Sequence, residues 1–180
     1  SPTRWREPAG PRPLARRPHL ALERARAVEY LRSMPNPPSG CWTLRCDGGA
    51  RGNPGPGALG YALIDPSGRE VDARGETLGV VTNNVAEYRA LIAGLESAAH
   101  HQADPLTVCM DSELVVRQMT GEYRVKHAGL KPLHAEARRA AGRFASVRFV
   151  AVRREDNARA DQLVNETLDR ALDTNSESPR

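Results

Sequence analysis

The order of strand-like and helix-like segments after residue 40 is the strongest constraint that the sequence places on the fold. Three strand-like segments come first, at residues 41–46, 58–64 and 71–81. Helical and strand-like patterns then alternate, with helices expected over 83–101, 112–120, 130–143 and 156–172 and strands over 106–110 and 147–152. A meander of strands followed by βα units predicts an α/β fold, in which a mixed sheet carries helices on its faces.

The connections between these segments are marked by turn residues. Gly48 to Gly57 is rich in Gly, Pro and Asn, which predicts a turn after the first strand. Asp65-Pro66-Ser67-Gly68 is a hairpin signal between the second and third strands. Asn83 or Asn84 is expected to cap the first long helix.

The first 40 residues differ in composition from the rest. They hold eight of the 14 prolines and eight arginines against three glutamates, whereas residues 41–180 hold 18 Lys and Arg against 19 Asp and Glu. Such a segment is expected to be a largely disordered basic extension, with a short helix possible within Leu20–Met34. It is either a solvated tail or an arm that touches nucleic acid. We therefore divide the chain into this extension (1–40), a folded domain (41–173) and a polar tail (174–180).

Membrane and secretory classes are disfavoured by the sequence. No apolar stretch has the length of a transmembrane helix, and the first residues contain no apolar core of a signal peptide. The three cysteines are too few and too irregularly spaced for a disulfide framework or a zinc site, so reduced core thiols are expected. A cytoplasmic protein without a membrane partner is the expectation.

Four acidic residues stand near the ends of predicted elements. Asp47 and Asp111 each follow a strand directly, and parallel neighbouring strands would bring both to the carboxyl edge of the sheet. Glu87 lies one turn into the first long helix, and Asp161 lies in the second turn of the last one. Clustered carboxylates repel one another unless cations neutralise them, and oxygen ligands suit Mg²⁺ or Mn²⁺. Two such ions can clamp the attacking and leaving oxygens of a phosphodiester.

These acids belong to four sequence blocks that resemble those of type 1 ribonucleases H. The blocks are Asp47-Gly48-Gly49 with Gly52-Asn53-Pro54-Gly55, Thr82-Asn83-Asn84-x-x-Glu87, Asp111-Ser112-x-x-Val115 and Asn157-x-x-x-Asp161-x-Leu163. Each block alone is a weak signal, but all four occur in the family's order over about residues 41–172. The resemblance implies a ribonuclease H-like fold with a five-stranded mixed sheet, three strands antiparallel and the others parallel. It also implies endonucleolytic hydrolysis of the RNA strand of RNA–DNA hybrids, leaving 5′-phosphate ends.

The resemblance assigns roles to individual residues of this chain. The metal-binding and catalytic carboxylates would be Asp47, Glu87, Asp111 and Asp161, holding two Mg²⁺ ions during catalysis, with Mn²⁺ as an alternative. The residues that would contact nucleic acid are Gly48, Asn53, Thr82, Asn83, Asn84 and Asn157. The partner would be an RNA–DNA hybrid, and the protein would act as a monomer.

The chain departs from the better-known bacterial pattern in three places. The segment from Val152 to Asn157 lacks the histidine that the pattern has before the last helix, and Arg153, Arg154 or Glu155 are candidates to replace it. The basic protrusion is missing, because residues 121–126 lead almost directly into the next helix, so the chain resembles the compact members of the family. Val80 stands where many relatives have an arginine at a DNA-phosphate pocket.

Two alternative functions remain open from the sequence. One is a non-catalytic module that binds hybrids, although all four carboxylates are present. The other is a ribonuclease H-like nuclease that also cuts double-stranded RNA.

Overall fold

The computed structural model describes residues 40–176, with side chains up to residue 173. The expected extension at 1–40, including the helix within Leu20–Met34, lies almost entirely outside the described residues. In the described part the strands are β1 (Trp42–Ala50), β2 (Gly55–Ile64), β3 (Glu70–Val81), β4 (Leu106–Met110) and β5 (Val147–Ala151). The helices are α2 (Asn83–His100), α3 (Glu113–Met119), α4 (Lys131–Ala141) and α5 (Ala158–Ser176), and the short 3-10 helices η1 (Ala128–Leu130) and η2 (Arg154–Asn157) precede α4 and α5.

The strands form one mixed sheet in the order β3-β2-β1-β4-β5. The pairs β1–β2 and β2–β3 are antiparallel, whereas β1–β4 and β4–β5 are parallel. The hairpin between β2 and β3 closes as expected, because the Asp65 carboxylate accepts the backbone N–H groups of Ser67 and Arg69 at 2.9 and 3.0 Å. The predicted α/β fold with a five-stranded mixed sheet is confirmed.

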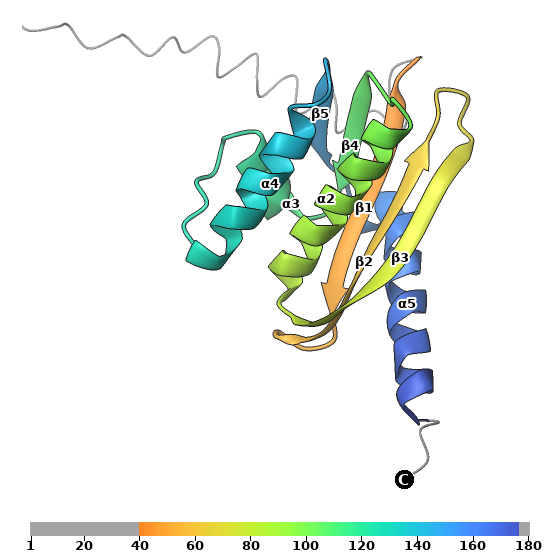
Figure 1. The fold of residues 1–180 in the computed structure, drawn as a ribbon, viewed down its shortest axis with the longest axis vertical. Helices are drawn as coiled ribbons and strands as arrows, with labels where there is room; N and C mark the ends of the chain where they lie inside the picture. The colour runs from red at the N-terminus through yellow and green to blue at the C-terminus, as the bar shows by residue number, and fades with distance from the viewer. Residues whose placement is uncertain (1–39, 177–180) are drawn as a thin grey trace, which may run out of the picture.

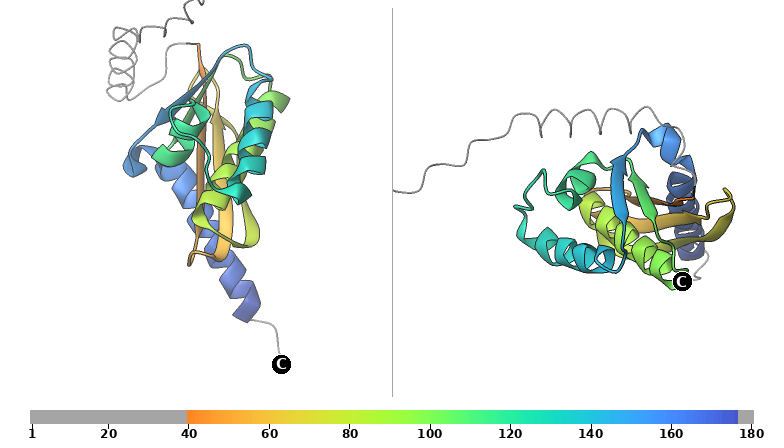
Figure 2. Two further views of the ribbon diagram at one scale, coloured as in Figure 1. Left: turned by 90° about the vertical axis from the view of Figure 1, so that its left-hand side faces the viewer. Right: turned by 90° about the horizontal axis from the view of Figure 1, so that it is seen from above.

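The helices cover both faces of this sheet. Helices α2 and α4 lie together on one face, and α5 packs on the other face across β1, β2 and β3 (Figures 1 and 2). The main core lies between the sheet and α2, where Leu44, Leu63, Tyr88, Leu91 and Leu95 are fully buried. Among the described residues, no helix combines the length and the apolar character needed to cross a bilayer.

Strand β1 is longer than the sequence predicts. The turn expected over Gly48 to Gly57 is wrong at both ends, because β1 continues to Ala50, with Gly48 paired to Leu59, and β2 already begins at Gly55. The physical reason is close packing: a Cβ at Gly48 would lie 2.1 Å from the backbone carbonyl carbon of Ala86 in α2. Glycine at this position therefore lets a helix touch a strand and does not break the strand.

Two helix boundaries also differ from expectation. Helix α2 is capped by Thr82 and not by an asparagine, since the Thr82 hydroxyl accepts the Val85 N–H at 3.4 Å. The sequence predicts the last helix over Asp156 to about Leu172, whereas α5 begins at Ala158 after η2 and runs to Ser176.

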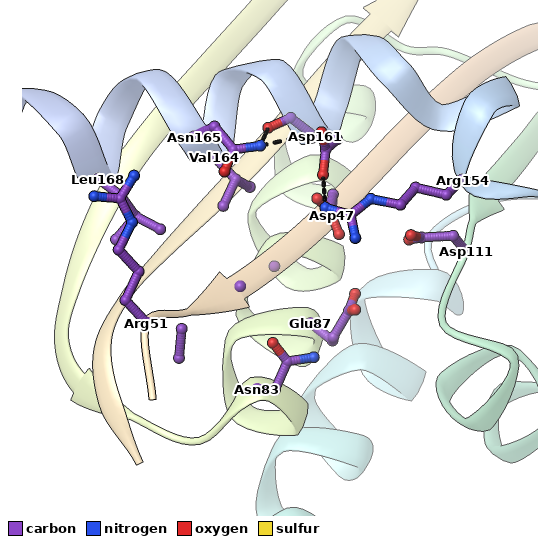
Figure 3. A pocket seen from close by; sticks show the side chains of 13 residues that line it. Asp47, Arg51, Asn83, Glu87, Asp111, Arg154, Asp161, Val164, Asn165 and Leu168 are labelled. Atoms are coloured by element: carbon purple, nitrogen blue, oxygen red, sulfur yellow. Dashed lines mark hydrogen bonds and ion pairs between the residues drawn. The ribbon is translucent and has the colours of Figure 1, made fainter. Parts of the chain in front are cut away.

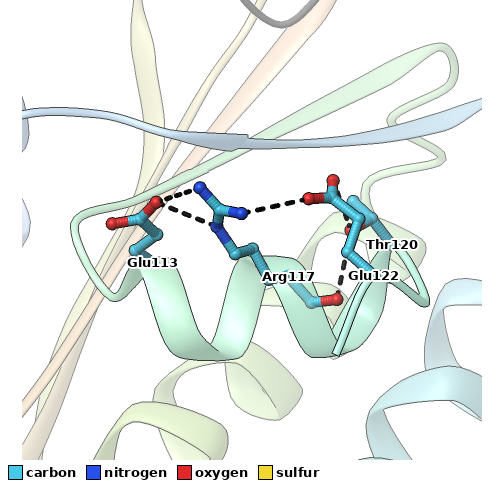
Figure 4. A network of polar contacts seen from close by, with 4 residues as sticks. All are labelled: Glu113, Arg117, Thr120 and Glu122. Atoms are coloured by element: carbon cyan, nitrogen blue, oxygen red, sulfur yellow. Dashed lines mark hydrogen bonds and ion pairs between the residues drawn. The ribbon is translucent and has the colours of Figure 1, made fainter. Parts of the chain in front are cut away.

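A polar network organises the short connection that follows α3. The Arg117 guanidinium binds the carboxylates of Glu113 and Glu122, and the Thr120 hydroxyl lies 3.2 Å from both a Glu122 oxygen and the Arg117 carbonyl, so that its one hydrogen can go to either (Figure 4). The same guanidinium lies 5.1 Å from the centre of the exposed Tyr123 ring. These contacts hold a compact loop in the place where the bacterial pattern has its basic protrusion.

Candidate active site

Three of the four predicted carboxylates meet at the edge of the sheet. Asp47 lies in β1, Asp111 follows β4, and the parallel pairing of these strands brings the two residues side by side. Glu87 enters from α2, one turn after the helix begins. One oxygen from each of the three carboxylates lies within 4.8 Å of the other two. The expectation that Asp47 and Asp111 reach the same edge of the sheet agrees with the structure, and Glu87 joins them there.

Burial and mutual repulsion disfavour the ionised form of these acids. Burial is the main cause that raises the pKa of Asp47 to about 7, and the charges of Asp111 and Asp161 add to it. Burial likewise raises the pKa of Glu87 to about 9, with further contributions from Asp47 and Asp111. The backbone N–H of Gly48 opposes both shifts without cancelling them. Without a cation, the site is therefore electrostatically strained.

Asp161 faces the same pocket but has different partners. Its Oδ1 accepts from the Arg154 guanidinium at 2.6 Å, and its Oδ2 accepts from the Asn165 amide at 3.0 Å (Figure 3). The hydrogen bond to Asp161 is the largest cause that raises the Arg154 pKa, and Arg154 also lowers the pKa of Asp47. Arg154 comes from η2, the connection in which the bacterial pattern has its histidine. Of the three candidates that the sequence left open, only Arg154 is among the described residues that line the pocket.

Asn157 is fully buried, and its burial corrects the contact with nucleic acid that the sequence predicts for it. Its amide group donates to the Cys46 carbonyl at 2.9 Å and to Asp111 Oδ1 at 3.4 Å. It thereby ties the start of α5 to β1 and to a carboxylate of the cluster. We assign it to positioning Asp111, because a fully buried side chain cannot reach a substrate.

The carboxylates line an open pocket of about 280 Å³. Its walls come from β1 and the turn after it, α2, the end of β4, η2 and α5 (Figure 3). The lining residues are Asp47, Gly48, Gly49, Ala50, Arg51, Asn83, Glu87, Asp111, Arg154, Asp161, Val164, Asn165 and Leu168. Arg51 was not singled out from the sequence, although it lies inside the Gly-rich block. It looked like one more residue of a surface turn.

Of the other predicted nucleic-acid residues, Asn83 lines the pocket and Asn53 is hydrogen-bonded to Asn83. Asn53, Thr82, Asn83 and Asn84 are all exposed. The Asn53 side-chain oxygen accepts the Asn83 backbone N–H at 3.1 Å, which fastens the turn after β1 to the first turn of α2. Gly48 differs from these four, because it is buried and can offer a ligand only its backbone. Val80 is 72% exposed near the end of β3, so the position where many relatives have an arginine is an apolar surface here.

The carboxylate cluster fits a hard divalent cation. Glu87 Oε2 is buried and has no hydrogen-bond partner among the described residues. A buried carboxylate oxygen without a partner is costly unless a cation satisfies it. Asp47, Glu87 and Asp111 would hold the ion with oxygen ligands alone, a ligand set that suits a hard divalent cation.

The Asp161 position gives a test of a ligand oxygen in this pocket. Replacing Asp161 by Ala removes both oxygens, so we expect kcat to fall by about 100-fold. Asp161→Asn keeps one oxygen that can coordinate, so its loss should be milder, about 10-fold. Steady-state kinetics on an RNA–DNA hybrid, the substrate that the family resemblance implies, measure both variants. Equal losses would contradict a ligand role for an oxygen here and favour a role in holding Arg154.

A family model described as reverse transcriptase-like matches residues 45–167. Among curated proteins, ribonuclease HI of Halobacterium salinarum is 43% identical over 125 residues, which are 69% of this chain and 63% of that protein. The mycobacterial relatives are longer, and the matched region is 35% of their length. The chain thus spans between about a third and two thirds of the length of these relatives.

Solved structures of this family superpose on most of the described chain. The structure of RNase H1 from the halophilic archaeon Halobacterium salinarum is 42% identical, has a TM-score of 0.70, and is matched over 98% of its length and 72% of this chain. LC11-RNase H1 from compost, in complex with an RNA/DNA hybrid, is 43% identical, has a TM-score of 0.68, and is matched over 99% of its length and 73% of this chain. The sheet order, the carboxylate cluster and these relatives together show that the chain belongs to the type 1 ribonuclease H family.

Proposed function

We propose that this protein hydrolyses the RNA strand of RNA–DNA hybrids with the help of divalent metal ions. The observation that carries the proposal is the meeting of Asp47, Glu87 and Asp111, whose oxygens lie within 4.8 Å of one another in an open pocket. A relative with 43% identity has been solved in complex with an RNA/DNA hybrid, which supports the substrate class. Mg²⁺ is the proposed ion, with two ions acting during catalysis.

When bound, the ions would supply an acidified water as nucleophile and neutralise charge on the phosphate. Asp47, Glu87 and Asp111 would hold them, and Asn157 keeps Asp111 oriented through its amide hydrogen bond. Arg154 brings a positive charge to the same pocket from η2. Its pairing with Asp161 places that charge where it can approach a phosphate oxygen or a departing product.

The exposed amides explain the preference for a hybrid in this proposal. Asn53, Asn83 and Asn84 lie on the turn after β1 and on the first turn of α2, which are fastened together. Side-chain amides both donate and accept, so they suit the minor-groove edges of bases and the 2′-hydroxyl. The 2′-hydroxyl distinguishes RNA from DNA. Cleavage would therefore require RNA in the strand that enters the carboxylate site.

The direct experiment compares three matched duplexes with Mg²⁺ and with Mn²⁺: an RNA–DNA hybrid, double-stranded RNA and double-stranded DNA. We expect cleavage of the RNA strand of the hybrid, 5′-phosphate ends, and no cleavage in EDTA. Binding without cleavage under both metals would instead indicate a non-catalytic hybrid-binding module. Cleavage of double-stranded RNA at a similar rate would broaden the substrate class.

A further inference from the structure

Arg51 lines the pocket, but the proposed chemistry gives it no role. The pocket contains two positively charged side chains, Arg154 beside the carboxylates and Arg51 on the turn after β1 (Figure 3). Each of them pairs with a carboxylate from α5: Arg154 with Asp161, and Arg51 with Asp169. Both arginines are therefore held by ion pairs to α5, at two different positions along that helix.

The spacing along α5 separates these two positions. Asp161, Asn165 and Asp169 recur every four residues, so they share one face of the helix. The eight residues from Asp161 to Asp169 correspond to about 12 Å of helix. Phosphates of one strand repeat about every 3.4 Å along a duplex axis. A phosphate near Arg51 would therefore be about two to four nucleotides away from the one near Arg154.

The turn that carries Arg51 is fixed by its backbone. The Arg51 N–H donates to the Pro56 carbonyl at 2.8 Å, and a Cβ on Gly55 would lie 2.1 Å from the Arg51 carbonyl oxygen. The hydrogen bond from Asn83 to Asn53 ties the same turn to α2. The Arg51 side chain therefore starts from a well-defined backbone position beside the pocket.

The ion pair with Asp169 is open to exchange. The side chains of Arg51 and Asp169 are 40% and 63% exposed, and ion pairs this accessible contribute little to stability. A guanidinium binds phosphate as readily as carboxylate, with two parallel hydrogen bonds. The pocket itself carries four carboxylates, which repel a polyanionic substrate unless cations offset them.

From these contacts we propose that Arg51 forms a subsite for a non-scissile phosphate of the cleaved RNA strand, and that Asp169 competes with this phosphate for the guanidinium. The continuity of the pocket from the carboxylates to Arg51 places the contact on the strand that enters the site. This inference rests on the proposed function, because its ligand is the hybrid substrate.

The test compares Arg51→Ala, Asp169→Asn and the double variant with the unchanged protein. Arg51→Ala should raise KM about 3- to 10-fold and flatten the slope of log KM against log salt by about 0.7 to 0.9, with kcat within about twofold. Asp169→Asn should lower KM by about 2- to 5-fold, because it frees the guanidinium and removes a negative charge. In a protein that already carries Arg51→Ala, Asp169→Asn should lower KM by clearly less, since no guanidinium remains to be freed.

Arg74→Ala is the matched control. Arg74 is also an exposed arginine paired with a carboxylate, Glu76, but it does not line the pocket. The Arg74→Ala variant should show the same KM as the unchanged protein and the same slope of log KM against log salt. Equal effects of Arg51→Ala and Arg74→Ala would show a general charge effect and would overturn the subsite.

A second measurement identifies the strand. Hybrids with a neutral methylphosphonate at single positions of the DNA strand should leave the difference between the unchanged protein and Arg51→Ala intact. If one of these substitutions removes the difference, the contact is on the DNA strand and the proposal is wrong. An unchanged protein that cleaves no hybrid would refute the proposed function. A protein that cleaves normally but is insensitive to Arg51→Ala would refute only this inference.

Discussion

Asp47→Asn is expected to reduce hydrolysis of a hybrid by at least about a thousandfold while making the metal-free protein more stable. Asp47 is the β1 member of the carboxylate cluster, and its amide replacement has no negative charge with which to hold a divalent ion. The residue is 7% exposed, and Asn has nearly the same size as Asp, so little packing is lost. Activity and stability should therefore move in opposite directions.

The stability gain follows from the raised pKa of Asp47, which is about 7 in the folded protein against an ordinary value of 3.8. Between these two values the folded state binds more protons than the unfolded state, so stability falls as the pH rises through this window. Above pH 7 the full cost is present, on the order of 2–4 kcal/mol. Asn carries no such cost. The gain should thus be largest above pH 7 and shrink as the pH falls toward 4.

Thermal unfolding of metal-free protein at several pH values measures this effect. At pH 8 the Asp47→Asn variant should melt roughly 5–10 °C above the unchanged protein, and near pH 4 the two curves should approach each other. Adding Mg²⁺ should stabilise the unchanged protein more than the variant. A lower melting temperature of the variant at every pH would make Asp47 a structural residue. Substantial Mg²⁺-dependent cleavage by the variant would remove it from the metal site.

The sequence predicted the fold well because periodicity and turn residues directly reflect the sheet. The hairpin at Asp65 follows from local signals. The parallel pairing of the first and fourth strands is a condition of the sequence argument, and the structure meets it. The convergence of Asp47, Glu87 and Asp111 follows from that topology together with the family resemblance. These features depend on short segments and on the order of elements, which are visible in one sequence.

The parts that sequence reasoning missed depend on contacts between distant segments. Gly48 looked like a turn residue, because nothing local shows that α2 passes against it. Asn157 belongs to a family block and was assigned to the substrate, but its burial against Cys46 is a tertiary fact. Arg51 and Asp169 are 118 residues apart, and only the folded chain brings them together beside the pocket.

Gly48→Ala is the second change for which we expect a large effect. A Cβ at this position would lie 2.1, 2.2 and 2.3 Å from the carbonyl carbon and oxygen of Ala86 and the backbone nitrogen of Glu87. All three are backbone atoms, so no side chain can rotate to make room. Helix α2 would have to move away from β1, and overpacking of this kind typically costs about 1–3 kcal/mol or more. The same movement would shift Glu87 away from Asp47 and Asp111.

The expected result is a double loss, in stability and in activity at temperatures where the variant is still folded. A misplacement of about 1 Å in a catalytic group can cost about 100-fold in rate, so kcat should fall by about that factor.

Gly49→Ala is the matched control, because its Cβ would meet only Val164 Cγ1, at 3.2 Å, in the same pocket wall. It should lose less than about 1 kcal/mol and keep most of its activity. The stabilisation by Mg²⁺ separates the two causes: it should weaken in Gly48→Ala, since the cluster is distorted, and persist in Gly49→Ala. A Gly48→Ala variant with normal stability and normal response to Mg²⁺ would show that α2 can give way at this point without disturbing Glu87.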